Sequence, residues 1–124
     1  MVALRVDVPV ASPVEQVTAR LDGAAADPNS IVGWFTRDPA VRATVDRSDG
    51  GWRVAVVAPA FLADSHVTVI PRDSGSIITI EGDLSGRGLF SVATPALALA
   101  RSRIEDTARR TLHREFGDPA GSIR

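Results

Sequence analysis

Large apolar residues alternate with smaller or polar ones through the first ten positions of the chain. The apolar positions are Val2, Leu4, Val6, Val8 and Val10. A period of two predicts a β-strand with one buried face and one solvated face. Pro9 has no backbone N–H to donate, so we expect it at the end of this strand or on the edge of a sheet.

Four more apolar runs occupy the middle of the chain, at residues 41–45, 52–56, 61–70 and 76–84. Short segments that contain glycine separate the first run from the second, at residues 48–51, and the third from the fourth, at residues 71–75. Glycine tolerates the positive φ that tight turns require, so these segments are predicted to be turns. Runs of this length joined by short turns indicate the hairpins of an antiparallel sheet.

Helix signals follow the first strand. Ser12 is placed to cap a helix, Pro13 suits its first position, and Glu15 would complete a capping box. Gly23 is a possible stop for that helix. A second start signal, Asp-Pro, opens the apolar segment 27–35. We therefore predict two short helices between the first strand and the hairpins.

The C-terminal third carries the longest helical pattern. Thr94 can cap a helix and Pro95 suits its first position. Apolar residues then recur every three or four positions, which makes one continuous stripe: Leu97, Ala100, Ile104, Ala108, Leu112 and Phe116. Gly117 is expected to end the helix. Segregated strands and helices predict a single α+β domain over residues 1–117 with an antiparallel sheet. Residues 118–124 are expected to form a frayed tail.

Composition narrows the chemistry open to this domain. All 14 basic residues are arginine, and the chain contains neither lysine nor cysteine. Lysine Schiff bases, thiolate nucleophiles, disulfides and cysteine metal sites are therefore excluded. His66 and His113 lie far apart in the sequence, so we expect no metal site. No motif indicates a cofactor, and a net charge of −1 gives no field that attracts nucleic acid.

The sequence also bears on where the protein works. It holds no apolar run of about 18 residues, so no membrane span is expected. The N-terminus lacks the basic and then apolar pattern of a signal peptide, which favours a cytoplasmic protein.

Three segments resemble parts of the START-like, or helix-grip, superfamily, which includes the polyketide cyclase/dehydrase and lipid-transport proteins (SRPBCC). They are the entry into the first helix at 11–17, the Val-Gly-Trp-Phe segment at 32–35, and the glycine-containing approach to the last helix at 82–88. The resemblance covers almost the whole chain, in pattern more than in identity. It implies a curved antiparallel sheet that grips the long C-terminal helix, with a pocket between them. The chain is short for that superfamily, so the resemblance leads us to expect one or two strands to be reduced or missing.

That resemblance yields a candidate pocket. Its wall would comprise Trp34, Trp52, His66, Ile78, Ile80, Ala100 and Ile104. Each aromatic residue in the set either stacks on a ligand or fills the core. His66 either faces the pocket as an acid–base or hydrogen-bonding group, or faces solvent. The leading hypothesis is binding of a small hydrophobic or amphipathic molecule.

Two alternatives belong to other classes. A cyclase- or dehydratase-like enzyme would need an acid–base group inside the cavity, supplied by His66, Asp46, Asp64 or Glu81. An interaction module would instead use an exposed sheet edge or the arginine-rich face of the last helix, and would need no cavity. The sequence leaves open whether the protein is an enzyme.

Overall fold

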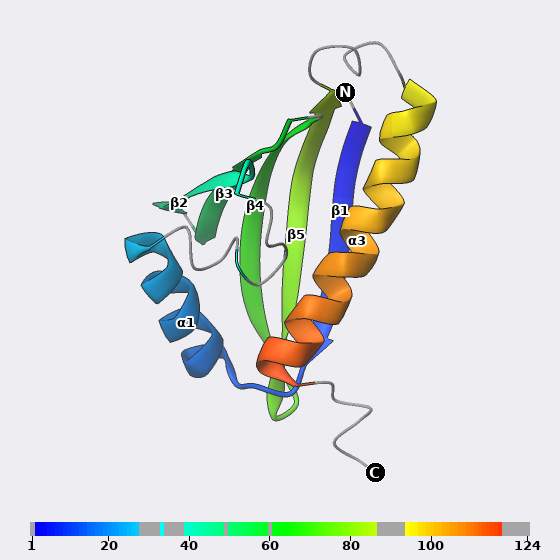
Figure 1. The fold of residues 1–124 in the computed structure, drawn as a ribbon. Coiled ribbons are helices and arrows are strands. Elements are labelled where there is room, and N and C mark those ends of the chain that lie inside the picture. The colour runs from blue at the N-terminus through cyan, green and yellow to red at the C-terminus, as the bar shows by residue number, and fades with distance from the viewer. Residues whose placement is uncertain are drawn as a thin grey trace.

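The computed structural model describes residues 2–27, 33, 39–48, 50–59, 61–86 and 94–117, with side chains in the last helix from Leu99 onward. The elements follow in the order β1 (Val2–Val10), α1 (Val14–Ala26), β2 (Arg42–Ser48), β3 (Gly51–Val57), β4 (Phe61–Arg72), β5 (Gly75–Gly86) and α3 (Thr94–Phe116) (Figure 1). The predicted α+β class is confirmed. The second predicted short helix and the predicted tail at 118–124 lie outside the described residues.

The strands form one antiparallel sheet in the order β1-β5-β4-β3-β2. Strands β2 to β5 are successive hairpins, and β1 joins the far side of β5. Since β1 is an edge strand, Pro9 lies where its missing N–H breaks no ladder within the sheet, as predicted.

The two faces of the sheet differ sharply. Both described helices pack on one face, which we call the inner face; the opposite side is the outer face (Figure 1). Residues opposite each other in the register share a face. One inner row therefore joins Val6, Ile80, Val67 and Trp52. The next row along each strand lies on the outer face and joins Arg5, Glu81, His66, Arg53 and Asp46.

The core lies between the inner face and the two helices. Helix α1 contributes Val17, Leu21 and Ala24, and α3 contributes Ala108, Leu112 and Phe116, all buried. Burying each large aliphatic or aromatic side chain stabilises the fold by roughly 1.5–3 kcal/mol. No described helix is both long and apolar enough to cross a membrane.

The helices meet at one end and diverge toward the other (Figure 1). At the closed end, the guanidinium of Arg20 on α1 lies 3.1 Å from the carboxylate of Glu115 on α3. The same guanidinium lies 4.9 Å from the ring centre of Phe116. These contacts hold the C-terminal end of α3 against α1, and the two described helices cover less of the inner face at the other end, where they diverge.

Ser12 does not cap α1 as the sequence suggested. The helix begins at Val14 after Pro13, and no side chain caps it. The Ser12 hydroxyl instead donates to the carbonyl of Phe116 at 2.7 Å, so it ties down the end of α3. Gly23 lies inside α1, which continues to Ala26, because burial of Leu21 and Ala24 against the sheet outweighs the weak helix propensity of one glycine.

Two predicted glycine positions are confirmed. Gly50 turns the chain between β2 and β3 with φ of 76°. Gly117 follows α3 with φ of 88°, and its N–H donates to the carbonyl of His113 at 2.9 Å. Both positions need the left-handed backbone region that glycine enters without steric cost.

Candidate functional site

A cavity of about 350 Å³ lies between the inner face of the sheet and the helices. Every described strand and both described helices contribute to its wall, together with Val41 just before β2. The lining residues are Leu4, Val6, Leu21, Val41, Ala43, Val54, Val56, Phe61, Ala63, Ser65, Val67, Ile78, Ile80, Arg103, Ile104, Glu105, Thr107, Ala108 and Leu112. The wall is therefore almost wholly apolar, as ligand cavities in proteins commonly are.

Small residues on the inner face help to explain why this space is open. Ala63 and Ser65 are successive inward-facing positions of β4, and Ala43 lies on the same face of β2. Ser65 pairs with Gly82 of β5, where a Cβ atom would collide with the backbone of Asp64, so β5 presents no side chain beside Ser65. Because α1 and α3 also diverge here, no larger side chain among the described residues closes the gap between them.

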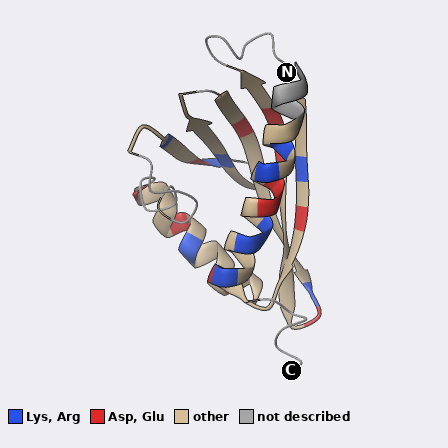
Figure 2. Ribbon diagram, turned by 45° about the vertical axis from the view of Figure 1, so that its right-hand side comes forward, with Lys and Arg blue, Asp and Glu red and all other residues tan. Residues whose placement is uncertain are grey.

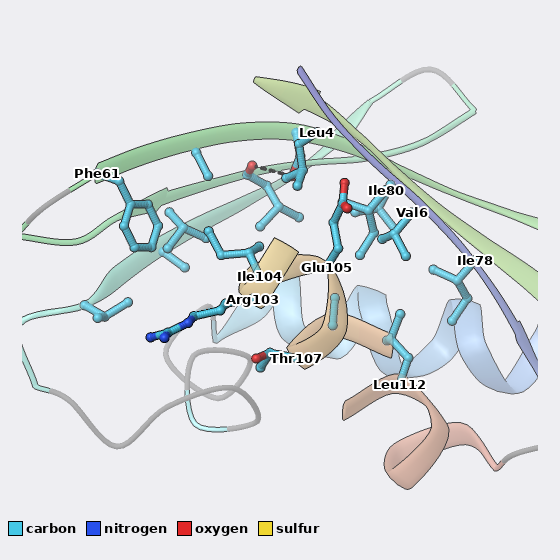
Figure 3. A pocket seen from close by; sticks show the side chains of 18 of the residues that line it. Leu4, Val6, Phe61, Ile78, Ile80, Arg103, Ile104, Glu105, Thr107 and Leu112 are labelled. Atoms are coloured by element: carbon cyan, nitrogen blue, oxygen red, sulfur yellow. Dashed lines mark hydrogen bonds between the residues drawn. The ribbon is translucent and has the colours of Figure 1, made fainter. Parts of the chain in front are cut away.

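Two of the polar side chains in the wall already have hydrogen-bond partners. The Ser65 hydroxyl donates to the carbonyl of Val54 at 3.1 Å. Glu105 accepts a hydrogen bond from the backbone N–H of Arg5, with 3.3 Å between the nitrogen and Oε2. Figure 3 shows Glu105 extending from α3 toward the strands, near Val6 and Ile80. Both side chains are therefore engaged in hydrogen bonds to backbone groups of the sheet, which leaves few polar groups in the wall that could bind a ligand.

Helix α3 also protects the free edge of β1. Besides the Glu105 contact with Arg5, Nε2 of His113 lies 3.0 Å from the carbonyl oxygen of Pro9. A carbonyl only accepts, so the His113 nitrogen carries the proton of this bond. The histidine is half-buried. Covering an edge in this way blocks pairing with another chain.

Three of the seven predicted wall residues line the cavity: Ile78, Ile80 and Ile104. Ala100 is half-buried and packs against the cluster of Ala63 and Leu84, and it is not in the cavity wall. Trp34 lies outside the described residues.

Trp52 belongs to the solid core and does not line the cavity. It is 3% exposed, and its indole N–H donates to Oδ1 of Asp22 on α1 at 2.9 Å. The guanidinium of Arg47 lies over the ring at 4.5 Å from its centre and also bonds Asp22 at 2.9 Å. Its role in this structure is to fix α1 on the sheet.

His66 lies on the outer face, across the sheet from the cavity. It is paired with Arg53 and Glu81, while its neighbours Ser65 and Val67 point inward. The placement of His66 in the pocket wall is therefore corrected. The alternation along β4 could have predicted this placement. Ala63, Ser65 and Val67 on one face are less polar than the residues that alternate with them, which include His66.

The other acid–base candidates share that outer face. Asp46 and Glu81 lie in the same row as His66, and Asp64 lies in the next outward-facing row. Two hydrogen bonds from Arg53, at 3.1 and 2.6 Å, hold the pKa of Asp64 below its usual value. A hydrogen bond from Thr79 likewise lowers the pKa of Asp7. The lowered pKa keeps the carboxylates of Asp64 and Asp7 charged at neutral pH.

The sequence interpretation missed most of the wall. It found none of the contributions of β1, α1 and β2, because only the folded register brings Leu4, Leu21 and Ala43 to one space. Arg103 and Glu105 of the last helix were not among the predicted wall residues either. Among the described residues, no three His, Asp or Glu side chains lie close enough together to hold a metal ion.

No family model matches the chain, and a search of curated proteins also found no match. Among solved structures, the chain is similar to TTHA0849 from Thermus thermophilus, with 13% sequence identity and a TM-score of 0.47. That alignment covers 90% of this chain and 92% of the other. A likeness of this size assigns neither a family nor a function, so the START-like resemblance stays a prediction.

Proposed function

We propose that this domain binds a small hydrophobic or amphipathic molecule between the inner face of its sheet and helix α3. The observation that carries the proposal is the cavity of about 350 Å³ with its apolar wall. Its volume falls within the range of roughly 300–1,000 Å³ that is usual for small-molecule sites. An apolar ligand that enters this space leaves water at a gain of about 25 cal/mol per Å² of buried apolar surface.

The positions of the polar side chains favour binding over catalysis. The four residues proposed as acid–base groups, His66, Asp46, Asp64 and Glu81, lie on the outer face. The one carboxylate in the described wall, Glu105, accepts a hydrogen bond from the edge of β1. A general acid or base must reach the reacting atom within hydrogen-bond distance, and none of the four does so from the outer face.

A neutral fluorescent probe tests the proposal. N-phenylnaphthylamine becomes brighter when it leaves water, so its titration with the purified protein should give a saturable rise in fluorescence. A long-chain alcohol should displace the probe and raise the melting temperature, because ligands that bind only the folded state stabilise it. Unsaturable fluorescence, with no displacement and no thermal shift, would overturn the proposal.

A matched pair of substitutions locates the binding. Ala63→Leu places a larger side chain in the cavity wall, and Ala55→Leu places the same side chain on the outer face of the neighbouring strand. The first should weaken probe binding at least fivefold, while the second should leave it within twofold of wild type. Ala43→Leu, at another wall position, repeats the test if Ala63→Leu does not fold.

A further inference from the structure

One arginine stands apart from the other basic residues of the chain. Arg103 is the only basic side chain among the described residues that line the cavity, and it is exposed. A side chain that both lines a cavity and reaches solvent marks its rim. Figure 3 shows Arg103 leaving α3 toward the side where Phe61 lies, and Glu105 leaving it toward Val6 and Ile80.

The charge of Arg103 is also uncompensated within the described part of the chain. Arg20, Arg47, Arg53 and Arg109 each have a carboxylate oxygen within 3.3 Å. No described carboxylate lies within 4.0 Å of the Arg103 guanidinium, since none of the ion pairs among described residues includes it. Figure 2 shows the basic residues distributed along α3, so the position of Arg103 at the cavity, and not its charge alone, distinguishes it.

Resting on the proposed function, we infer that the ligand is an amphipathic anion whose carboxylate or other oxyanion pairs with Arg103 at the rim. The apolar body of the molecule fills the cavity, where the wall offers almost no polar partner. A guanidinium presents a planar fork of N–H donors that matches an oxyanion, and it gives up its hydration more readily than an ammonium does. Glu105 adds a negative charge to the wall, but its side chain points toward β1, away from the rim.

Three ligands that share one ten-carbon chain separate the head group from the tail: decanoate, decanol and decylammonium. Each ligand is titrated as a competitor of N-phenylnaphthylamine for the wild-type protein, at low salt and neutral pH and below the micelle concentration of the ligand. Wild type should bind decanoate on the order of tenfold more tightly than decylammonium, with decanol between them. The preference should weaken with added salt because the rim is solvated.

Arg103→Gln removes the charge and keeps most of the side chain. It should abolish the preference for decanoate and leave the affinity for decanol within twofold of wild type. Arg110→Gln on the same helix is the matched control, because Arg110 is exposed and does not line the cavity. It should keep the full preference.

Two failures are distinguishable. If all three ligands bind equally well to wild type, and Ala63→Leu weakens each of them, the cavity binds ligands and the inference about the head group is wrong. That inference is also wrong if Arg110→Gln weakens the preference as much as Arg103→Gln does. If none of the three ligands displaces the probe or shifts the melting temperature, the proposed function itself is overturned.

Discussion

The inner and outer faces of the sheet are built from alternate residues of the same strands, yet they hold different chemistry. On the inner face, the row of Val6, Ile80 and Val67 packs toward the helices and borders the cavity. The adjacent row along the strands lies on the outer face and carries His66 and Glu81. A shift of one residue in the pairing register of a strand would exchange its inward-facing and outward-facing residues. A chemically attractive side chain therefore carries no functional meaning until its face is known.

The largest contrast between the faces should be in stability. Leu84 is fully buried on the inner face, and Leu62 on the outer face of β4 is 40% exposed. Leu84→Ala should lower the free energy of unfolding by about 3 kcal/mol, because it removes buried apolar surface and leaves a cavity. Leu62→Ala should cost less than about 1 kcal/mol. Urea unfolding of both variants measures the difference, and equal losses would contradict the assignment of faces.

A smaller contrast concerns the packing of the inner face itself. Ala24 on α1 is 2% exposed within the solid core, and Ala63 borders the cavity. Ala24→Leu should cost about 1–3 kcal/mol through overpacking, whereas Ala63→Leu should cost less than half as much because its side chain enters open space. Thermal melts of the two variants compare them directly. If Ala63→Leu were the more destabilising, the space beside it would not be open.

The outer face should show a pH dependence of modest size. The hydrogen bonds from Arg53 lower the pKa of Asp64 in the folded protein, so this carboxylate contributes stability above its usual pKa of 3.8. The contribution is lost as the pH falls through the lower folded value. The difference in melting temperature between wild type and Asp64→Asn should therefore narrow below about pH 4, and salt should reduce it at neutral pH. A difference that widens in acid would contradict the direction of this pKa shift.

The smallest expected effect is that of His66→Ala. Because His66 lies on the outer face, its removal should leave probe and decanol binding within twofold of wild type. The melting temperature should change by no more than a few degrees, since the side chain is only partly buried. A loss of binding comparable to that of Ala63→Leu would place His66 in the site and reverse the comparison of the two faces.

Local patterns predicted the elements well and the site poorly. The alternation from Val2 to Val10, the turn at Gly50 and the helix end at Gly117 each follow from the preferences of neighbouring residues. They needed no knowledge of the rest of the fold. The bounds of β4 and β5 were less accurate, because pairing continues through Pro71 to a turn that needs only two residues.

Long-range contacts decided what local patterns could not. The sequence places Ser12 where it could cap α1, but its hydroxyl donates a hydrogen bond to the carbonyl of Phe116 instead. Trp52 was a candidate for stacking on a ligand because it is aromatic. In the structure it is buried, and its indole N–H donates to Asp22 of α1. The cavity depends on small residues from different strands whose shared position follows from the sheet register alone, as Ala43 and Ala63 illustrate.

Methyl NMR during a titration with decanol tests the central claim most directly, because it reports on both faces in one experiment. The methyl resonances of Val6, Ile80 and Ile104, which line the cavity, should shift and saturate together. Those of Leu62 and Ile70, which are exposed on the outer face, should stay in place. Shifts confined to the outer face, or no saturable shift at all, would contradict a ligand cavity between the sheet and α3.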